Sequence, residues 1–265
     1  MKKRELWRTV KRFLWFLVLS QGIGVFSAYI YLIITSPAKE NYETAMNRGI
    51  ESGVIVWTMI VGYTVTIAWF LGRRHVRLTM GRLRYSNLWA TVGMSEVIAI
   101  AWLLIEMSLM TLIDADKLFA DEIEELEYMD RLFKGVTGFL ALGILAPISE
   151  EIGLRGVLLG GLLRARVRPW VAIICSAVVF GALHGTEIQL LGTVVFGIIS
   201  GWLLWRTRSL LPGMIMHITN NSFVGIAGYI WKDDDEDPAT WILIVILAVC
   251  IPLLVYGLKW FHKRW

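Results

Sequence analysis

The chain has 265 residues, of which 56% are hydrophobic and 18% are charged, and its formal net charge is +4. A soluble domain is usually about a quarter charged and has no apolar run of about 20 residues, so this composition excludes an ordinary water-soluble fold. The positive charges lie in blocks between apolar runs, which indicates a lipid bilayer and no nucleic-acid partner.

Eight apolar runs are long enough, or nearly so, to cross a membrane. They lie at about 13–35, 50–72, 87–113, 133–163, 169–184, 188–205, 210–231 and 241–259. The first is too long for a cleaved signal peptide, the fourth is overlong and interrupted by charge, and the fifth is short. We therefore predict an all-α, polytopic membrane bundle of about eight transmembrane helices.

The order of the apolar runs divides the chain into three parts. Residues 1–130 hold the first three spans and an acidic outer loop, 131–232 form a polar core, and 233–265 hold the last span. Small residues at four-residue spacing, as at Gly181/Gly185 and Gly197/Gly201, predict close helix contacts inside the core. Cys175 and Cys250 lie in apolar runs and are predicted to pack there, without a disulfide or a cysteine zinc site.

The distribution of basic residues predicts the orientation. Nineteen of the 26 Lys and Arg residues lie in the segments that face one side when the spans alternate, and six face the other side. Cytoplasmic loops retain positive charge, so we expect both termini in the cytoplasm and the protein in the plasma membrane. The acidic segments 114–130 and 233–237 then lie outside.

Three ionisable residues lie inside the fourth span, where each costs on the order of 3 kcal/mol to insert. Glu151 and Arg155 are four residues apart, share a helix face and are expected to form an ion pair. Glu150 points about 100° away and has no local partner. A carboxylate taken out of water becomes a better proton acceptor, so Glu150 is a candidate general base.

Two further pairs are also spaced by one helical turn. Phe180 and His184 lie in the fifth span, and His217 and Asn221 lie in the seventh. A count at 1.5 Å per residue brings most of these groups to one depth, but it puts His217 about 12 Å nearer the cytoplasm than His184. A carboxylate with an imidazole can deprotonate water, and an imidazole with a carboxamide can stabilise an oxyanion, which together are the groups of an amide hydrolase.

These residues resemble a known family. Glu-Glu-x-x-x-Arg, Phe-x-x-x-His and His-x-x-x-Asn on successive spans are similar to the CPBP intramembrane proteases, which include the Rce1-type CAAX prenyl endopeptidases and bacterial Abi proteins of bacteriocin processing and self-immunity. The resemblance covers about 135–230, with Leu154 where the family usually has an aromatic residue.

The resemblance implies the role of each residue. Glu150 and His184 would activate water, and His217 and Asn221 would stabilise the oxyanion. Glu151 and Arg155 would hold the architecture, and Phe180 would position His184. The implied substrate is a membrane-associated protein or peptide: a prenylated CAAX protein, a bacterial peptide precursor or another membrane protein.

Several alternatives remain open. The family is commonly called a metalloendopeptidase, and Glu150, His184 and His217 could give zinc two imidazoles and a carboxylate. The sequence favours a metal-free mechanism, because no HExxH spacing is present and the counted depths separate the two histidines. A proton- or ion-coupled transporter and a catalytically idle scaffold are the other hypotheses. Glu96 and Glu106 in the third span do not share a face and are read as polar groups that face the bundle.

Overall fold

The computed structural model describes residues 2–35, 42–73, 87–122, 131–230 and 238–265, and the regular structure within these ranges is entirely helical. Six helices are long and apolar enough to cross a membrane. They are Lys2–Thr35, Val54–Gly72, Leu88–Leu112, Gly135–Arg164, Glu187–Thr207 and Thr240–Arg264. The predicted all-α polytopic membrane bundle is confirmed.

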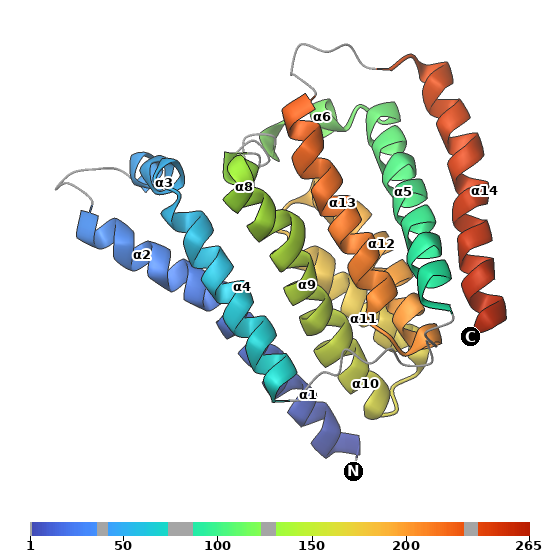
Figure 1. Cartoon of the computed structure of the whole chain (residues 1–265), viewed down its shortest axis with the longest axis horizontal. Helices are drawn as coiled ribbons and strands as arrows, with labels where there is room; N and C mark the ends of the chain where they lie inside the picture. The colour runs from blue at the N-terminus through green and yellow to red at the C-terminus, as the bar shows by residue number, and fades with distance from the viewer. Residues whose placement is uncertain (1, 36–41, 74–86, 123–130, 231–237) are drawn as a thin grey trace.

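Two more helices lie at the positions of the other two predicted spans. Helix α11 (Pro169–Ala182) is a shorter apolar helix of 14 residues, and α13 (Leu211–Ile230) has 20 residues and carries the polar side chains of the seventh span. Figure 1 shows the helices running side by side, with both ends of the chain toward the same end of the bundle. Such an arrangement is typical of an even number of crossings.

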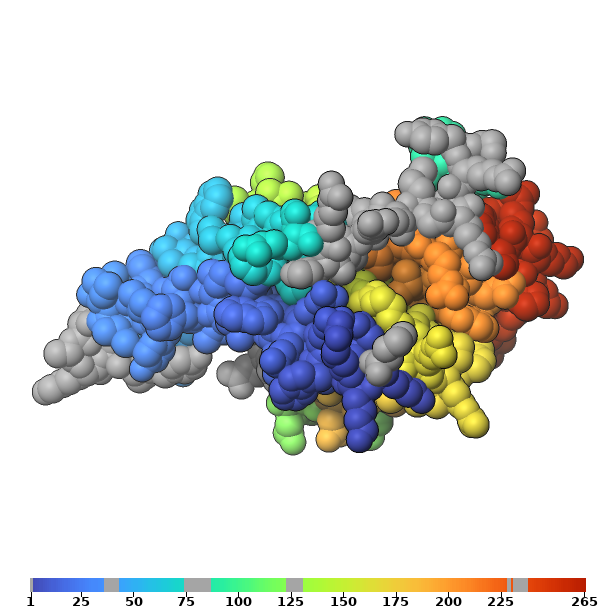
Figure 2. Space-filling model, turned by 90° about the horizontal axis from the view of Figure 1, so that it is seen from below, coloured from blue at the N-terminus to red at the C-terminus, as the bar shows by residue number. Residues whose placement is uncertain are grey.

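The first long helix consists of α1 (Lys2–Leu17), a π-helical turn η1 (Val18–Gly22) and α2 (Ile23–Thr35). It packs along α4 (Val54–Gly72) and against the end of the long helix Gly135–Arg164. Figure 2 shows the second contact from below, between the dark blue and yellow segments. The ring of Phe16 covers Gly153, where a side chain would collide with it. A short helix that the sequence reading missed, α3 (Tyr42–Glu51), joins α2 to α4.

The long helix Gly135–Arg164, which we call the central helix, runs through the middle of the bundle between α4 and α13 (Figure 1). Its successive parts are α8 (Gly135–Gly138), η4 (Phe139–Leu145), α9 (Ala146–Glu150), η5 (Glu151–Leu159) and α10 (Gly160–Arg164). Segments η4 and η5 are π-helical. Pro147 lies two residues after the end of η4 and has no N–H to continue the backbone ladder, which accounts for a break in regular α-geometry here.

The remaining helices enclose this central helix. Helix α11 packs closely on α12 (Glu187–Thr207), because Gly197 and Gly181 have no side chain at the contact. A Cβ on Gly197 would lie 2.9 Å from the Cα of Ala177, so the predicted close approach is confirmed. On the other side, α5 (Leu88–Leu112) packs against both α13 and α14 (Thr240–Arg264).

The N-terminal end of α12 is held by a residue that is distant in the sequence. After α5 the chain forms the short helices α6 (Ala115–Leu118) and η3 (Ala120–Glu122). The carboxylate of Glu122 accepts hydrogen bonds of 3.0 Å from the backbone N–H groups of Glu187 and Ile188. These donors begin α12 and have no partner within the helix, so Glu122 caps it.

Candidate active site

The two adjacent carboxylates of the central helix lie in different surroundings. The Glu151 side chain is completely buried, whereas that of Glu150 is 20% exposed. An Oε1 of Glu151 lies 3.4 Å from Nη1 of Arg155, so the predicted ion pair is present. Both residues belong to the π-helical segment η5, and π-turns inside α-helices occur frequently at functional sites.

Aromatic rings surround the buried guanidinium. The Cζ of Arg155 lies 4.4 Å from the centre of the Phe180 ring and 6.0 Å from that of Phe196. Such cation–π contacts stabilise a charge that has been removed from water. Phe180 therefore contacts Arg155, which the sequence did not indicate.

His217 reaches from α13 to both carboxylates. Its Nδ1 lies 3.3 Å from Oε1 of Glu151, and its Nε2 lies 3.6 Å from Oε2 of Glu150. An ionised carboxylate can only accept hydrogen bonds, so we assign the hydrogen to Nδ1 and leave Nε2 facing Glu150. Glu150 thus lies beside an imidazole from another helix, although its own helix offers it no partner.

His184 lies just beyond the end of α11. Its Nδ1 is 3.0 Å from the carbonyl oxygen of Phe180. A carbonyl only accepts, so Nδ1 carries the hydrogen, and Nε2 of the neutral ring is a proton acceptor. Gly185 follows with a φ of 85°, a conformation that favours glycine and that keeps the chain from continuing as a helix past the histidine.

The counted depth of His217 was wrong. The Phe180 ring lies 4.7 Å from the ring centre of His184 and 5.4 Å from that of His217, so one phenyl ring contacts both imidazoles. The count assumed straight helices that stand upright in the membrane. The levels at which α11 and α13 begin and their tilts are not contained in such a count, so the counted separation of about 12 Å does not hold.

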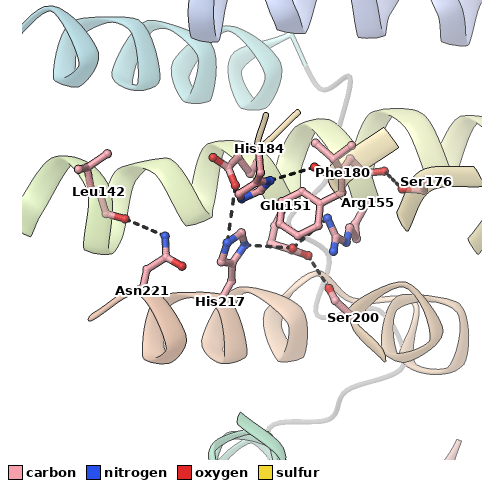
Figure 3. A network of polar contacts seen from close by, with 11 residues as sticks. Leu142, Glu151, Arg155, Ser176, Phe180, His184, Ser200, His217 and Asn221 are labelled. Atoms are coloured by element: carbon pink, nitrogen blue, oxygen red, sulfur yellow. Dashed lines mark hydrogen bonds and ion pairs between the residues drawn. The ribbon is translucent and has the colours of Figure 1, made fainter. Parts of the chain in front are cut away.

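Asn221 lies one turn along α13 from His217. Its Nδ2 donates a 3.0 Å hydrogen bond to the Leu142 carbonyl in η4. Figure 3 shows the carboxamide directed at this part of the central helix, while His217 points to the carboxylates. A carboxamide has a second N–H, so this bond leaves one donor for a ligand.

The sequence analysis missed two polar neighbours of the site. The Ser200 hydroxyl of α12 donates a 2.7 Å hydrogen bond to Oε2 of Glu151. Tyr63 of α4 is buried within electrostatic range of Glu150 and interacts with the side chain of Gln21. One serine or tyrosine in an apolar span gives no signal, since many such residues bond only to their own helix, as Ser95 does to the carbonyl of Thr91.

The two acids of α5 face the bundle, as predicted, but they reach different helices. Oε2 of Glu96 accepts a 2.7 Å hydrogen bond from Thr219 of α13. The Glu106 carboxylate lies against Gly192 of α12, where a Cβ would collide with it. Their neighbours, Thr219 and Gly192, do not belong to the Glu150 and Glu151 cluster, so we place both acids outside the site.

A three-ligand metal site is not formed by this arrangement. Within the described ranges, no group of three His, Cys, Asp or Glu side chains is placed to hold a metal ion. Nδ1 of His217 is directed at Glu151, and Nδ1 of His184 is directed at the Phe180 carbonyl, which leaves Nε2 of each ring as the nitrogen that could bind a ligand. As these side chains stand, Glu150, His184 and His217 nevertheless do not come together as a three-ligand set for zinc, and we route no step through a metal.

Fold and site together define a class: a multi-pass membrane protein that encloses a polar cluster of carboxylates, imidazoles and a guanidinium among its helices. Residues 132–223, about a third of the chain, match a family described as Rce1-like, type II CAAX prenyl endopeptidase Rce1-like. This match confirms the resemblance drawn from the three motifs, and every motif residue lies within it. No curated protein and no solved structure matched the chain.

Proposed function

We propose that the chain is an intramembrane endopeptidase that hydrolyses a peptide bond of a membrane-associated protein or peptide. One observation carries the proposal: within the Rce1-like region, the partly exposed Glu150 lies beside His217, while the neighbouring Glu151 is occupied by three other side chains. The catalytic core is then 131–232, flanked by 1–130 and 233–265.

Glu150 and His184 activate the water molecule. The Phe180 carbonyl keeps the hydrogen on Nδ1 of His184, so Nε2 is available to accept a proton. As the water oxygen bonds to the substrate carbonyl carbon, its proton passes to this pair. When the carbon–nitrogen bond breaks, the same proton passes to the leaving amine, and the active site returns to its starting state.

His217 and Asn221 stabilise the oxyanion of the tetrahedral intermediate. With one hydrogen of His217 directed at Glu151, Nε2 donates only when the ring is protonated. The buried Glu151 carboxylate stabilises that charged ring, so it acts on the chemistry through His217 as well as holding Arg155. The second N–H of Asn221 is the other donor.

We propose two candidate substrate classes. The family description names CAAX prenyl endopeptidases, so a prenylated protein is one candidate, beside a bacterial peptide precursor of bacteriocin processing or self-immunity. A site enclosed by membrane helices favours a substrate that is itself held at the bilayer. We propose a plasma-membrane location with both termini in the cytoplasm, supported by the distribution of Lys and Arg.

Purified protein in liposomes tests the proposal with quenched fluorescent peptides, prenylated and unprenylated, and with a pH-sensitive dye in the lumen. We expect peptide cleavage without proton movement, and its loss in Glu150→Gln. Glu96→Gln is the matched control, because it changes an intramembrane carboxylate that contacts Thr219 outside the site. Proton or ion flux without cleavage would establish the transporter hypothesis, and neither activity would support a scaffold.

A further inference from the structure

Glu151 is held by a larger set of side chains than the motifs contain. Its two oxygens have separate partners: Oε1 lies near Arg155 and His217, and Oε2 accepts the hydroxyl of Ser200. Ser200 is 1% exposed and comes from α12, a helix that supplies none of the motif residues. The contact therefore joins a further helix to the site (Figure 3).

A glycine makes this contact sterically possible. Gly213 lies in the first turn of α13 next to the bonded pair. A Cβ on Gly213 would lie 2.7 Å from Oε2 of Glu151 and would collide with the hydroxyl of Ser200. The central helix, α12 and α13 thus meet at Glu151, and they can do so because Gly213 has no side chain. His217 lies one turn further along α13.

The hydrogen bond fixes the orientation of the carboxylate plane. A carboxylate can turn about its terminal torsion, and a partial turn would move its oxygens away from Arg155, His217 and Ser200. With Oε2 held by the hydroxyl at 2.7 Å, a length typical of O–H donors to charged acceptors, Oε1 stays directed at the guanidinium and at Nδ1 of His217.

We propose that Ser200 is a positioning residue of the active site, which fixes Glu151 so that Nε2 of His217 faces the reacting carbonyl beside Glu150. The inference rests on the proposed peptidase function. Ser200 is buried with its hydroxyl on Glu151, so its effect passes through Glu151 and His217. Gly213 is part of the same arrangement, because only a residue without a side chain leaves room for the hydrogen bond between Ser200 and Glu151.

The test compares Ser200→Ala with Ser176→Ala in liposomes with a cleaved peptide. Ser176 is a matched control: it is 2% exposed, and its hydroxyl donates a 3.0 Å hydrogen bond to the Leu154 carbonyl in η5. Ser200→Ala should lower kcat about 10- to 100-fold with KM within about threefold, the effect expected when a hydrogen bond to a charged group is lost. Ser176→Ala should keep kcat within about threefold.

Two further variants separate positioning from folding. Ser200→Cys keeps the shape but is a weak donor, so it should fold like the parent and fall between serine and alanine in kcat. In a Glu151→Gln background, Ser200→Ala should change kcat by less than about threefold, because two residues that act through one path are not additive. Gly213→Ala should lower kcat as Ser200→Ala does.

The outcomes distinguish the two proposals. A parent protein that cleaves peptides, with Ser200→Ala and Ser200→Cys at the parent's kcat, would overturn the positioning role and leave the peptidase standing. Equal losses in Ser200→Ala and Ser176→Ala, or a full additive loss in the Glu151→Gln background, would also overturn it. A parent protein that cleaves no peptide refutes the peptidase, and with it the inference built on it.

Discussion

The buried ion pair offers the sharpest test of the site's architecture. Glu151 and Arg155 are 0% and 1% exposed and 3.4 Å apart, so neither charge has solvent to replace its partner. Arg155→Ala removes the guanidinium and its contact with Phe180, and leaves Glu151 with His217 and Ser200. Breaking one side of a buried pair costs about 3–5 kcal/mol. We expect lower folded yield and a melting temperature about 10 °C lower.

The double variant Glu151→Gln/Arg155→Met separates charge from volume. It removes both charges at once and keeps side chains of similar size, and replacing a complete buried pair in this way is often neutral or stabilising. We expect it to recover most of the lost melting temperature. Cleavage should remain measurable but slower than in the parent, because His217 has lost the carboxylate that stabilises its protonated ring.

A thiol-reactive dye can follow unfolding in detergent. Cys250 is 5% exposed and packs between α14 and α5, so it reacts only when the bundle opens. Cys175 is exposed and should be replaced by alanine in every variant. Arg155→Ala with the parent's melting temperature and cleavage rate would refute the pairing. A double variant as unstable as the single one would show that packing on Phe180, rather than charge, holds the site.

Three further predictions concern the oxyanion site, topology and metal. Asn221→Ala should lower kcat about 10²- to 10³-fold with substrate binding largely kept, whereas Glu150→Gln should abolish cleavage; equally mild losses at both positions would remove the assigned roles. Single cysteines at Asp121 and Ala239 of a cysteine-free protein should react with an impermeant reagent added outside, and labelling from the cytoplasm alone would reverse the orientation. Protein stripped by a strong chelator should keep its cleavage rate, and a loss that only added zinc restores would establish a metal enzyme.

The sequence predicted the helices well because their signal is local. Long apolar runs and the one-turn spacing of Glu151 and Arg155 are properties of single helices, and the structure confirms both. The structure also contains α3, most of which lies between the predicted spans 13–35 and 50–72, where the sequence analysis predicted no helix. Its ten residues are too few and too polar for the apolar-run criterion that found the spans.

The contacts between helices could not be read in the same way. Which carboxylate meets His217 depends on how α13 crosses the central helix, and the count of residues contains no crossing angle. The π-helical segments η4 and η5 change the register of Glu150 and Glu151 relative to an ideal helix. Ser200 and Tyr63 belong to helices that carry no motif, so only their position in space relates them to the site.

The packing of the helices around Glu150 and Glu151 gives these adjacent acids two different roles. Glu151 is completely buried, and Arg155, His217 and Ser200 occupy its oxygens, so any proton or substrate that reached it would first have to displace a partner. Glu150 is partly exposed, and its nearest imidazole nitrogen is 3.6 Å away, too far for a direct hydrogen bond. A catalytic base needs this freedom, because it must exchange protons with water in every cycle. The fixed carboxylate sets the direction of His217, and the freer one beside it can carry out the proton transfer.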